Sequence, residues 1–464
     1  SCVFYQGRVF HLWGKLDAAE PLYLEAKTIQ EKTLGKEHSD FATSLNNLGV
    51  LYVYMGNYEK AEPICVEAKA IREKILGKKH RDYVGSIGLL ASLYEDMGNY
   101  EKAEPLYLEA KAIQEKTLGK EHPFYTPILS ELANFYLKLG NYEKAESNYL
   151  EVKSILEKVF GKENSHYATC LNNLGILYQQ IDNLEKAGQL YLEAIAIREK
   201  KLSKEDSDYA WNLNNLASLY MEMRDYEKAE SMYFEAKAIL EKKFGKEYPD
   251  YSIMLNNLGN LYAEKGNYEK AEQMHLEAQI LREKVLGKEH PNYAETLINM
   301  ALLYTDMGKF EKAEPLFSEL FKVEQTLIAN ALHHLSEREM NIYLNQHSER
   351  QNHILSFAQK TKSKKSIPTC FDNSLFYKGF LLNAANQVKR LALSDSSSTE
   401  KYNRLKGFER RLAAQYTKPI SERDSATVDA LETQANDLEK GLARTVSGFG
   451  EAMRQVNWEE DRQN

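Results

Sequence analysis

The stretch Asn57-Tyr-Glu-Lys-Ala-Glu62 decides the fold, because it returns along the chain at a fixed interval. The same six residues, or a degraded form of them, begin at Lys15, Asn99, Asn141, Asn183, Asp225, Asn267 and Lys309. Each start lies 42 residues after the one before it. A fixed period of about 20 to 50 residues is typical of solenoids, which use long surfaces to hold other molecules. The sequence therefore predicts one unit repeated eight times.

Each repeat is expected to form a helical hairpin. Asp40 is expected to cap a first helix that ends at Gly56, because glycine readily adopts the left-handed conformation found at helix ends. Asn57 is expected to cap a second helix that runs from Tyr58 to about Ile75. Helix, turn and helix together make an αα-hairpin.

Apolar spacing assigns two faces to the first helix, which turns by about 100° per residue. The predicted buried stripe comprises Leu45, Leu48, Gly49 and Tyr52. The opposite face, which must meet solvent or a partner, comprises Asn46, Asn47, Val50 and Tyr54. In the second helix Ala61 recurs in the later repeats, and a small residue at one fixed place predicts a close crossing of two helices.

These residues resemble the tetratricopeptide repeat, in the 42-residue form of kinesin light chains. The matching positions are Leu48, Gly49, Tyr52, Gly56, Tyr58, Ala61 and Ala68, with the turn Leu118-Gly-Lys-Glu-His-Pro123. The resemblance implies an all-α fold, a right-handed superhelix of about eight hairpins over residues 1–322. A C-terminal helical bundle is expected over residues 323–464. In that family the first helices line a concave groove that holds extended peptides.

Paired asparagines on the exposed face of the first helices are the candidate binding residues. Helix interiors disfavour asparagine by about 0.5 kcal/mol relative to alanine, so helix propensity does not explain the pairs. A side-chain amide can donate to and accept from a peptide backbone; alternatively, it bonds to the neighbouring hairpin. The second asparagine of each pair is favoured for the groove, and repeats 3 and 4 lack the pair. The predicted site therefore centres on repeats 5 to 8, and the candidate groove residues are Asn47, Asn173, Asn215, Asn257, Asn299, Tyr54, Asn260, Glu222 and Glu264.

The first helices carry more acidic than basic residues. Their basic residues between 40 and 307 are few, chiefly Arg81, Lys138 and Lys265. Their acidic residues include Glu95, Asp96, Glu131, Glu222, Glu264, Glu295 and Asp306. A groove of this charge repels carboxylates and phosphates. We therefore expect a neutral or basic protein or peptide ligand, and no nucleic acid in the groove.

The composition excludes other classes of protein. The chain has 464 residues, 43% hydrophobic and 28% charged, with a net charge of −8, which is typical of a water-soluble helical protein. No apolar run is long enough to span a membrane and no leader opens the chain, so a cytoplasmic location without membrane contact is expected. Because the first residue is Ser1, the native start is expected upstream.

Neither a metal site nor a cofactor is expected. The four cysteines lie far apart without a C-x-x-C pair. Histidines recur on the turns between repeats, without a second ligand at helical spacing, and are expected to be solvated; they are His38, His80, His122 and His290. No catalytic arrangement is visible, so the chain is expected not to be an enzyme.

Helical patterning continues after the repeats end. Helices are expected over residues 315–335, 336–345, 348–360, 371–393, 399–416 and 421–446. The last of these spaces its apolar residues in a heptad-like pattern, at Val428, Leu431, Ala435, Leu438 and Leu442. A matching seam on the preceding helix comprises Leu405, Phe408 and Leu412, so we expect an antiparallel pair.

This C-terminal region resembles the segment that joins tetratricopeptide repeats to the CHAT domain, a caspase-like cysteine protease domain. The resemblance rests on residues 371–383, above all Leu375-x-Tyr-Lys-Gly-x-Leu-Leu-Asn383, and on the closing Val456-Asn-Trp458. In such proteins the protease begins just after the tryptophan, so its catalytic histidine and cysteine have no counterparts here. The first hypothesis is a sensing or regulatory arm of a CHAT-type protease, present in cis or in trans. The alternative is a free-standing adaptor of the kinesin-light-chain kind.

Overall fold

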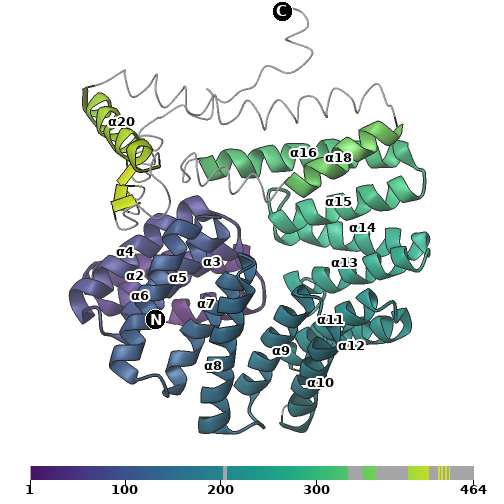
Figure 1. The fold of residues 1–464 in the computed structure, drawn as a ribbon, viewed down its shortest axis with the longest axis horizontal. Helices are drawn as coiled ribbons and strands as arrows, with labels where there is room; N and C mark the ends of the chain where they lie inside the picture. Colours follow the sequence, from purple (N-terminus) through teal and green to yellow (C-terminus); the bar gives the residue numbers. More distant parts are fainter. Residues whose placement is uncertain are drawn as a thin grey trace, which may run out of the picture. The chain divides into compact units, whose positions relative to one another are not determined.

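A computed structural model describes residues 2–201, 206–332, 348–361 and 396–416, together with residues 427, 428, 430, 431, 434, 435 and 438. The chain divides into two compact units, Ser1–Met307 and Gly308–Asn464. Both units are helical (Figure 1), and none of these residues is assigned to a strand. The predicted all-α fold is therefore confirmed.

The first unit is a series of helical hairpins (Figure 1). The first helices of the hairpins are α1 (Cys2–Leu12), α3 (Ser39–Tyr54), α5 (Arg81–Asp96), α7 (Thr126–Lys138), α9 (Ser165–Gln180), α11 (Ser207–Glu222), α13 (Pro249–Glu264) and α15 (Pro291–Asp306). The second helices are α2 (Leu16–Leu34), α4 (Tyr58–Leu76), α6 (Tyr100–Leu118), α8 (Tyr142–Phe160), α10 (Leu184–Lys201), α12 (Tyr226–Phe244) and α14 (Tyr268–Val285). A short 3-10 helix, η1 (Pro123–Tyr125), precedes α7. The repeated hairpins form a solenoid-like superhelix.

The caps explain where the helices begin. Asn57 caps α4 as predicted, because its side chain accepts from the backbone N–H of Lys60. The cap expected at Asp40 is wrong: α3 begins at Ser39, and its cap is His38, whose Nδ1 accepts from the Asp40 N–H at 3.1 Å. His80, His122 and His290 accept in the same way from the residue two positions later. The turn histidines are therefore helix caps, a role that was not predicted from the sequence.

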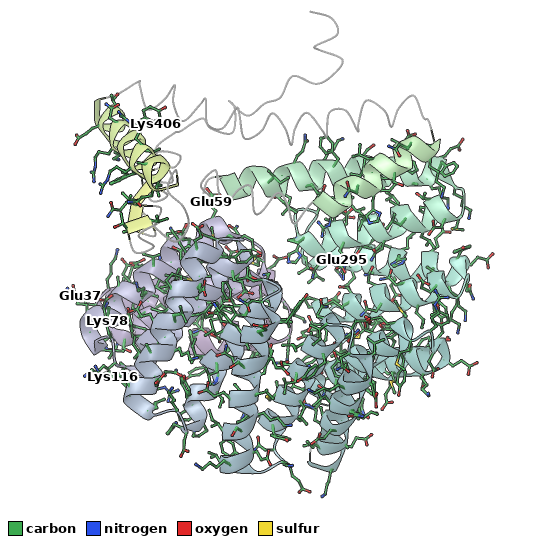
Figure 2. All side chains as sticks on the ribbon, viewed as in Figure 1. Glu37, Glu59, Lys78, Lys116, Glu295 and Lys406 are labelled. Carbon is green, nitrogen blue, oxygen red and sulfur yellow. The ribbon has the colours of Figure 1, made fainter. Side chains whose placement is uncertain are left out.

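The predicted core is confirmed. Leu45 and Leu48 are fully buried, Gly49 is buried, and Tyr52 is 3% exposed. Ala61 and its equivalents are also fully buried, at Ala103, Ala145, Ala187, Ala229, Ala271 and Ala313. Charged side chains such as Glu37, Lys78 and Lys116 project outward from the first hairpins (Figure 2).

Consecutive hairpins are joined by a recurring bond between a tyrosine and a glutamate 32 residues earlier. The tyrosine lies in a first helix, and the glutamate closes the six-residue repeat of the preceding hairpin. The pairs are Tyr52–Glu20, Tyr94–Glu62, Tyr136–Glu104, Tyr178–Glu146, Tyr262–Glu230 and Tyr304–Glu272. Gly188 replaces this glutamate in one repeat, so Tyr220 has no carboxylate at the corresponding place.

The second unit contains α16 (Phe310–Leu332), α18 (Ser348–Thr361) and α20 (Ser396–Tyr416). These agree with three of the helices expected from the sequence, although α16 begins five residues earlier. Phe357 of α18 packs on Phe310 and Phe317 of α16. Several residues of the predicted antiparallel seam are buried, namely Leu405, Leu412, Val428, Leu431 and Ala435. The helices expected at 336–345 and 371–393, most of 421–446, and the CHAT-like residues 371–383 and 456–458 lie outside the described residues.

Every helix in the described ranges is too short or too polar to span a lipid bilayer.

Candidate functional site

The first helices form a continuous layer within the first unit. Each contacts the next first helix along the chain, from α3 to α15. Helices that approach one another in this way lie on the inner side of a curved array. The half-exposed face of these helices is therefore the candidate site, as the sequence predicted.

Four asparagines of this layer form a hydrogen-bonded series across three hairpins. Asn257 Nδ2 donates to Asn214 Oδ1 at 2.8 Å, and Asn214 Nδ2 donates to Asn215 Oδ1 at 3.3 Å. Asn215 Nδ2 then donates to Asn172 Oδ1 at 3.0 Å. In these three hairpins the first members of the pairs are buried and the second members are half-buried. The alternative reading of the pairs, an amide that bonds to the neighbouring hairpin, is thus realised at Asn215 and Asn257.

The remaining candidate residues also lie on this layer. Asn47 Nδ2 donates to the Thr43 carbonyl of its own helix at 2.8 Å. The side chain of Tyr54 is 61% exposed. The half-buried members are Asn173, Asn260 and Asn299, and the exposed ones are Glu222 and Glu264. Peptide binding by these residues remains a prediction.

Repeats 3 and 4, which lack the asparagine pair, carry close carboxylates instead. Glu131 lies against Gly88, and burial together with nearby Glu95 raises the pKa of Glu131 to about 7. Burial also raises the pKa of Asp96 to about 6; Lys138, 3.8 Å away, opposes this rise and Glu95 adds to it. Lys138 also lies 3.5 Å from Glu95. Negative charge is therefore concentrated on the layer between α5 and α7.

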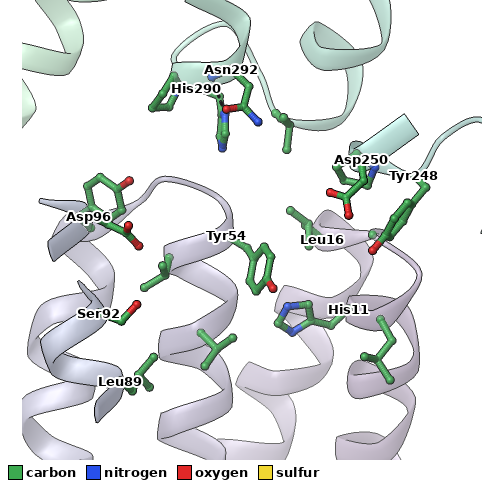
Figure 3. A pocket seen from close by; sticks show the side chains of 18 residues that line it. His11, Leu16, Tyr54, Leu89, Ser92, Asp96, Tyr248, Asp250, His290 and Asn292 are labelled. Carbon is green, nitrogen blue, oxygen red and sulfur yellow. Dashed lines mark hydrogen bonds between the residues drawn. The ribbon is translucent and has the colours of Figure 1, made fainter. Parts of the chain in front are cut away.

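A cavity of about 600 Å³ lies where residues 248–292 of the superhelix approach its N-terminal helices. One wall comes from the C-terminal ends of α1, α3 and α5, and the other from the turns that precede α13 and α15 (Figure 3). Its labelled polar residues are His11, Tyr54, Ser92, Asp96, Tyr248, Asp250, His290 and Asn292. Only Tyr54 among the predicted site residues lines this cavity.

The two walls touch at defined points, which we call the closure contact: Gly14 with Pro249, and His290 with Tyr54 and Gly56. A Cβ atom at Gly14 would lie 2.4 Å from Pro249 Cδ, so only glycine fits there. His290 Nδ1 accepts from the Asn292 N–H, so its other nitrogen carries the hydrogen that bonds the Tyr54 carbonyl.

Burial lowers the pKa of His290 to about 4; the bond to the Tyr54 backbone opposes this shift and nearby Arg282 adds to it. His290 is half-buried and bonded to Tyr54, so the expectation of a solvated turn residue is wrong at this position. The sequence offers no signal for this contact, because the superhelical path places together residues more than 200 positions apart.

The family model for the tetratricopeptide repeat matches residues 3–74, 40–116, 125–200, 208–279 and 252–323. The chain belongs to the tetratricopeptide repeat family. The match ends at residue 323, and the comparisons give no support for the expected relation of the C-terminal region to CHAT-associated segments. Comparison with curated protein sequences finds no match.

Several solved structures are similar to the chain. BtubC (BKLC) from P. vanneervenii is 25% identical, with 48% of this chain and 89% of that chain covered and a TM-score of 0.38. A Podospora anserina protein assigned as a kinesin light chain is 26% identical, with 44% and 97% covered and a TM-score of 0.37. Rap protein complexed with competence and sporulation factor is 14% identical, with 88% and 100% covered and a TM-score of 0.46. These likenesses describe the repeat architecture and carry no argument about ligands.

Proposed function

We propose that the chain is a protein-binding scaffold that holds an extended peptide segment on the inner layer of first helices. Tetratricopeptide repeat proteins are generally scaffolds rather than enzymes. The observation that carries the proposal is the set of half-buried amide and exposed carboxylate side chains on that layer, between Asn47 and Asn299. Such a row suits a peptide backbone, which offers donors and acceptors along its whole length.

The proposed ligand is neutral or basic. Glu131 and Asp96 both have raised pKa values, because burial and the neighbouring Glu95 disfavour their charged forms. A positively charged segment would stabilise these carboxylates, whereas an acidic segment would add repulsion. Lys138 compensates this charge only in part, because it is one cation beside several carboxylates.

The asparagine series limits which amides grip the peptide. Asn215 and Asn257 each already donate one N–H to a neighbouring asparagine, and an amide nitrogen carries two hydrogens. Each therefore keeps one N–H for the ligand while it joins two hairpins. Replacing Asn257 with alanine should weaken both roles, and replacing Asn299 should weaken binding with a smaller loss of stability.

The test is selection from a random peptide library displayed on phage, with the full chain as bait. Peptides enriched by the wild-type chain should be neutral or basic, and they should be lost on Asn257→Ala and Asn299→Ala chains of unchanged helicity. Enrichment of acidic peptides would contradict the charge assignment. If both variants bind the selected peptides as tightly as the wild-type chain does, the asparagines have a purely structural role.

The finer proposal is that this scaffold regulates a CHAT-type protease, in cis or in trans. Its support is the sequence resemblance at residues 371–383 and 456–458. Deletion of residues 371–446 from a protease-bearing version should abolish partner-dependent proteolysis. Unchanged proteolysis would favour the second candidate, an adaptor of the kinesin-light-chain kind that joins two proteins without controlling an enzyme.

A further inference from the structure

The cavity at the closure contact combines apolar walls with two carboxylates, without a lysine or arginine in its lining. Among its 18 lining residues the acidic ones are Asp96 and Asp250, and none is lysine or arginine. Its apolar residues include Leu12, Val50, Leu89 and Leu286. At about 600 Å³ the cavity is within the range of small-molecule sites, about 300 to 1,000 Å³.

The two carboxylates lie on opposite sides of Tyr54 (Figure 3). The pKa of the Tyr54 hydroxyl is raised chiefly by its partial burial and then by both carboxylates, so both carboxylates act on the same part of the cavity. Asp250 accepts hydrogen bonds from Tyr248 and Trp211, which hold it in place but bring no positive charge. Burial raises the pKa of Asp250 despite these bonds. The cavity therefore contains negative charge without a matching cation from its own lining.

The remaining titratable groups of the lining do not supply that cation. Burial lowers the pKa of His11 and of His290, so both imidazoles are neutral near pH 7. Lys138 reaches Asp96 from α7 at 3.8 Å, with nearly half of its side chain exposed, and does not line the cavity. The lining therefore offers neither carboxylate a lysine or arginine of its own.

We propose that this cavity binds the side chain of an arginine or lysine residue in the peptide held on the inner layer, with the cationic head between Asp96 and Asp250. Arginine and lysine combine an apolar stem with a charged end, which matches the leucine and valine walls and the two carboxylates. The face of Tyr54 adds a surface for a cation–π contact. The peptide part of this inference rests on the proposed function, because it requires a peptide on the same layer.

Ligand-observed saturation-transfer NMR on the full chain tests the cavity directly, with N-acetyl-arginine amide as the probe. The matched control ligand is N-acetyl-citrulline amide, which has nearly the same shape but no charge. We expect the arginine probe to bind at least fivefold more tightly. Equal binding of the two probes, or no binding of either, would overturn the inference.

Protein variants locate the binding. Asp96→Asn and Asp250→Asn should each weaken the arginine probe at least threefold, whereas Asp182→Asn removes one acidic charge outside the cavity and should have no effect. The Asp96 side chain is buried only in part, with 36% of it exposed, so its variant is expected to fold even if Asp250→Asn, which alters the bond to Trp211, does not. Unchanged affinity in folded Asp96→Asn would contradict the proposed position of the cation.

A longer probe separates a peptide side chain from a free amine. N-acetyl-Ala-Ala-Arg-Ala-Ala amide should bind more tightly than N-acetyl-arginine amide, since its backbone reaches the inner layer. Equal or weaker binding would overturn the peptide assignment and leave a site for small amines. Failure here is distinct from failure of the proposed function, because the library test depends on Asn257 and Asn299, which do not line the cavity.

Discussion

The Tyr94 hydroxyl donates a hydrogen bond to the Glu62 carboxylate at 2.9 Å, and this buried bond joins two consecutive hairpins. This bond explains why the repeated six-residue motif ends in glutamate. The other letters also have partners: Asn57 caps α4, Lys60 lies over the Tyr52 ring, and Ala61 is fully buried. The motif recurs because its residues both stabilise one hairpin and bind it to the next.

Tyr94→Phe should lower the free energy of unfolding by about 1.5 to 3 kcal/mol, because it leaves a buried carboxylate without this donor. The chain provides its own control. Tyr220→Phe alters the equivalent residue, which has Gly188 instead of a glutamate partner, and should cost less than about 0.5 kcal/mol. Urea unfolding followed by circular dichroism measures both; equal losses would mean that the carboxylate does not matter.

Gly14→Ala should open the closure contact. The added Cβ would lie 2.4 Å from Pro249 Cδ, so one of the two walls must move. Gly140→Ala is the matched control, because Gly140 occupies the same place in its repeat, has the same positive φ near 70°, and has open space around its Cβ. Both variants should lose about 1 kcal/mol from backbone strain. Only Gly14→Ala should increase the radius of gyration measured by small-angle X-ray scattering, and an unchanged radius would argue against the contact.

Much of this molecule could be predicted from its sequence, because its contacts are local. The caps at Asn57, the buried stripe around Leu48 and the alanine crossing at Ala61 all follow from periodicity within one repeat. The layer that carries the candidate residues follows from the same projection. The closure contact does not, since it depends on how small rotations between hairpins add up until Pro249 meets Gly14. The asparagine series is intermediate between these two cases. The sequence shows the recurring asparagines, but it does not determine which hydrogen-bond partner each amide has.

His290→Asn should flatten the dependence of stability on pH. The folded pKa of about 4 is below the ordinary value of about 6.5, so between these pH values the unfolded chain binds more protons than the folded chain. Wild-type stability therefore falls as pH drops from about 6.5 to 4, and His290 contributes at most about 3 kcal/mol of that loss. Asparagine keeps the cap, as Asn164 does at the equivalent place in α9, and removes the titration.

His80→Asn is the control for this change, because His80 caps α5 in the same manner but is exposed. Thermal unfolding between pH 4 and 7.5 compares the three chains. If the stability of His290→Asn depends on pH in the same way as that of the wild type, His290 takes up protons equally in the folded and unfolded chains. That result would contradict its burial at the closure contact.

Photo-crosslinking tests most directly whether ligands lie on the inner layer of first helices. A benzoylphenylalanine in place of Tyr54 reports on the inner layer, and one in place of Phe234, an exposed aromatic residue of α12, reports on the second helices. Peptides selected by the wild-type chain should crosslink at position 54 and not at position 234. Crosslinking at position 234 alone, or equally at both positions, would contradict the account.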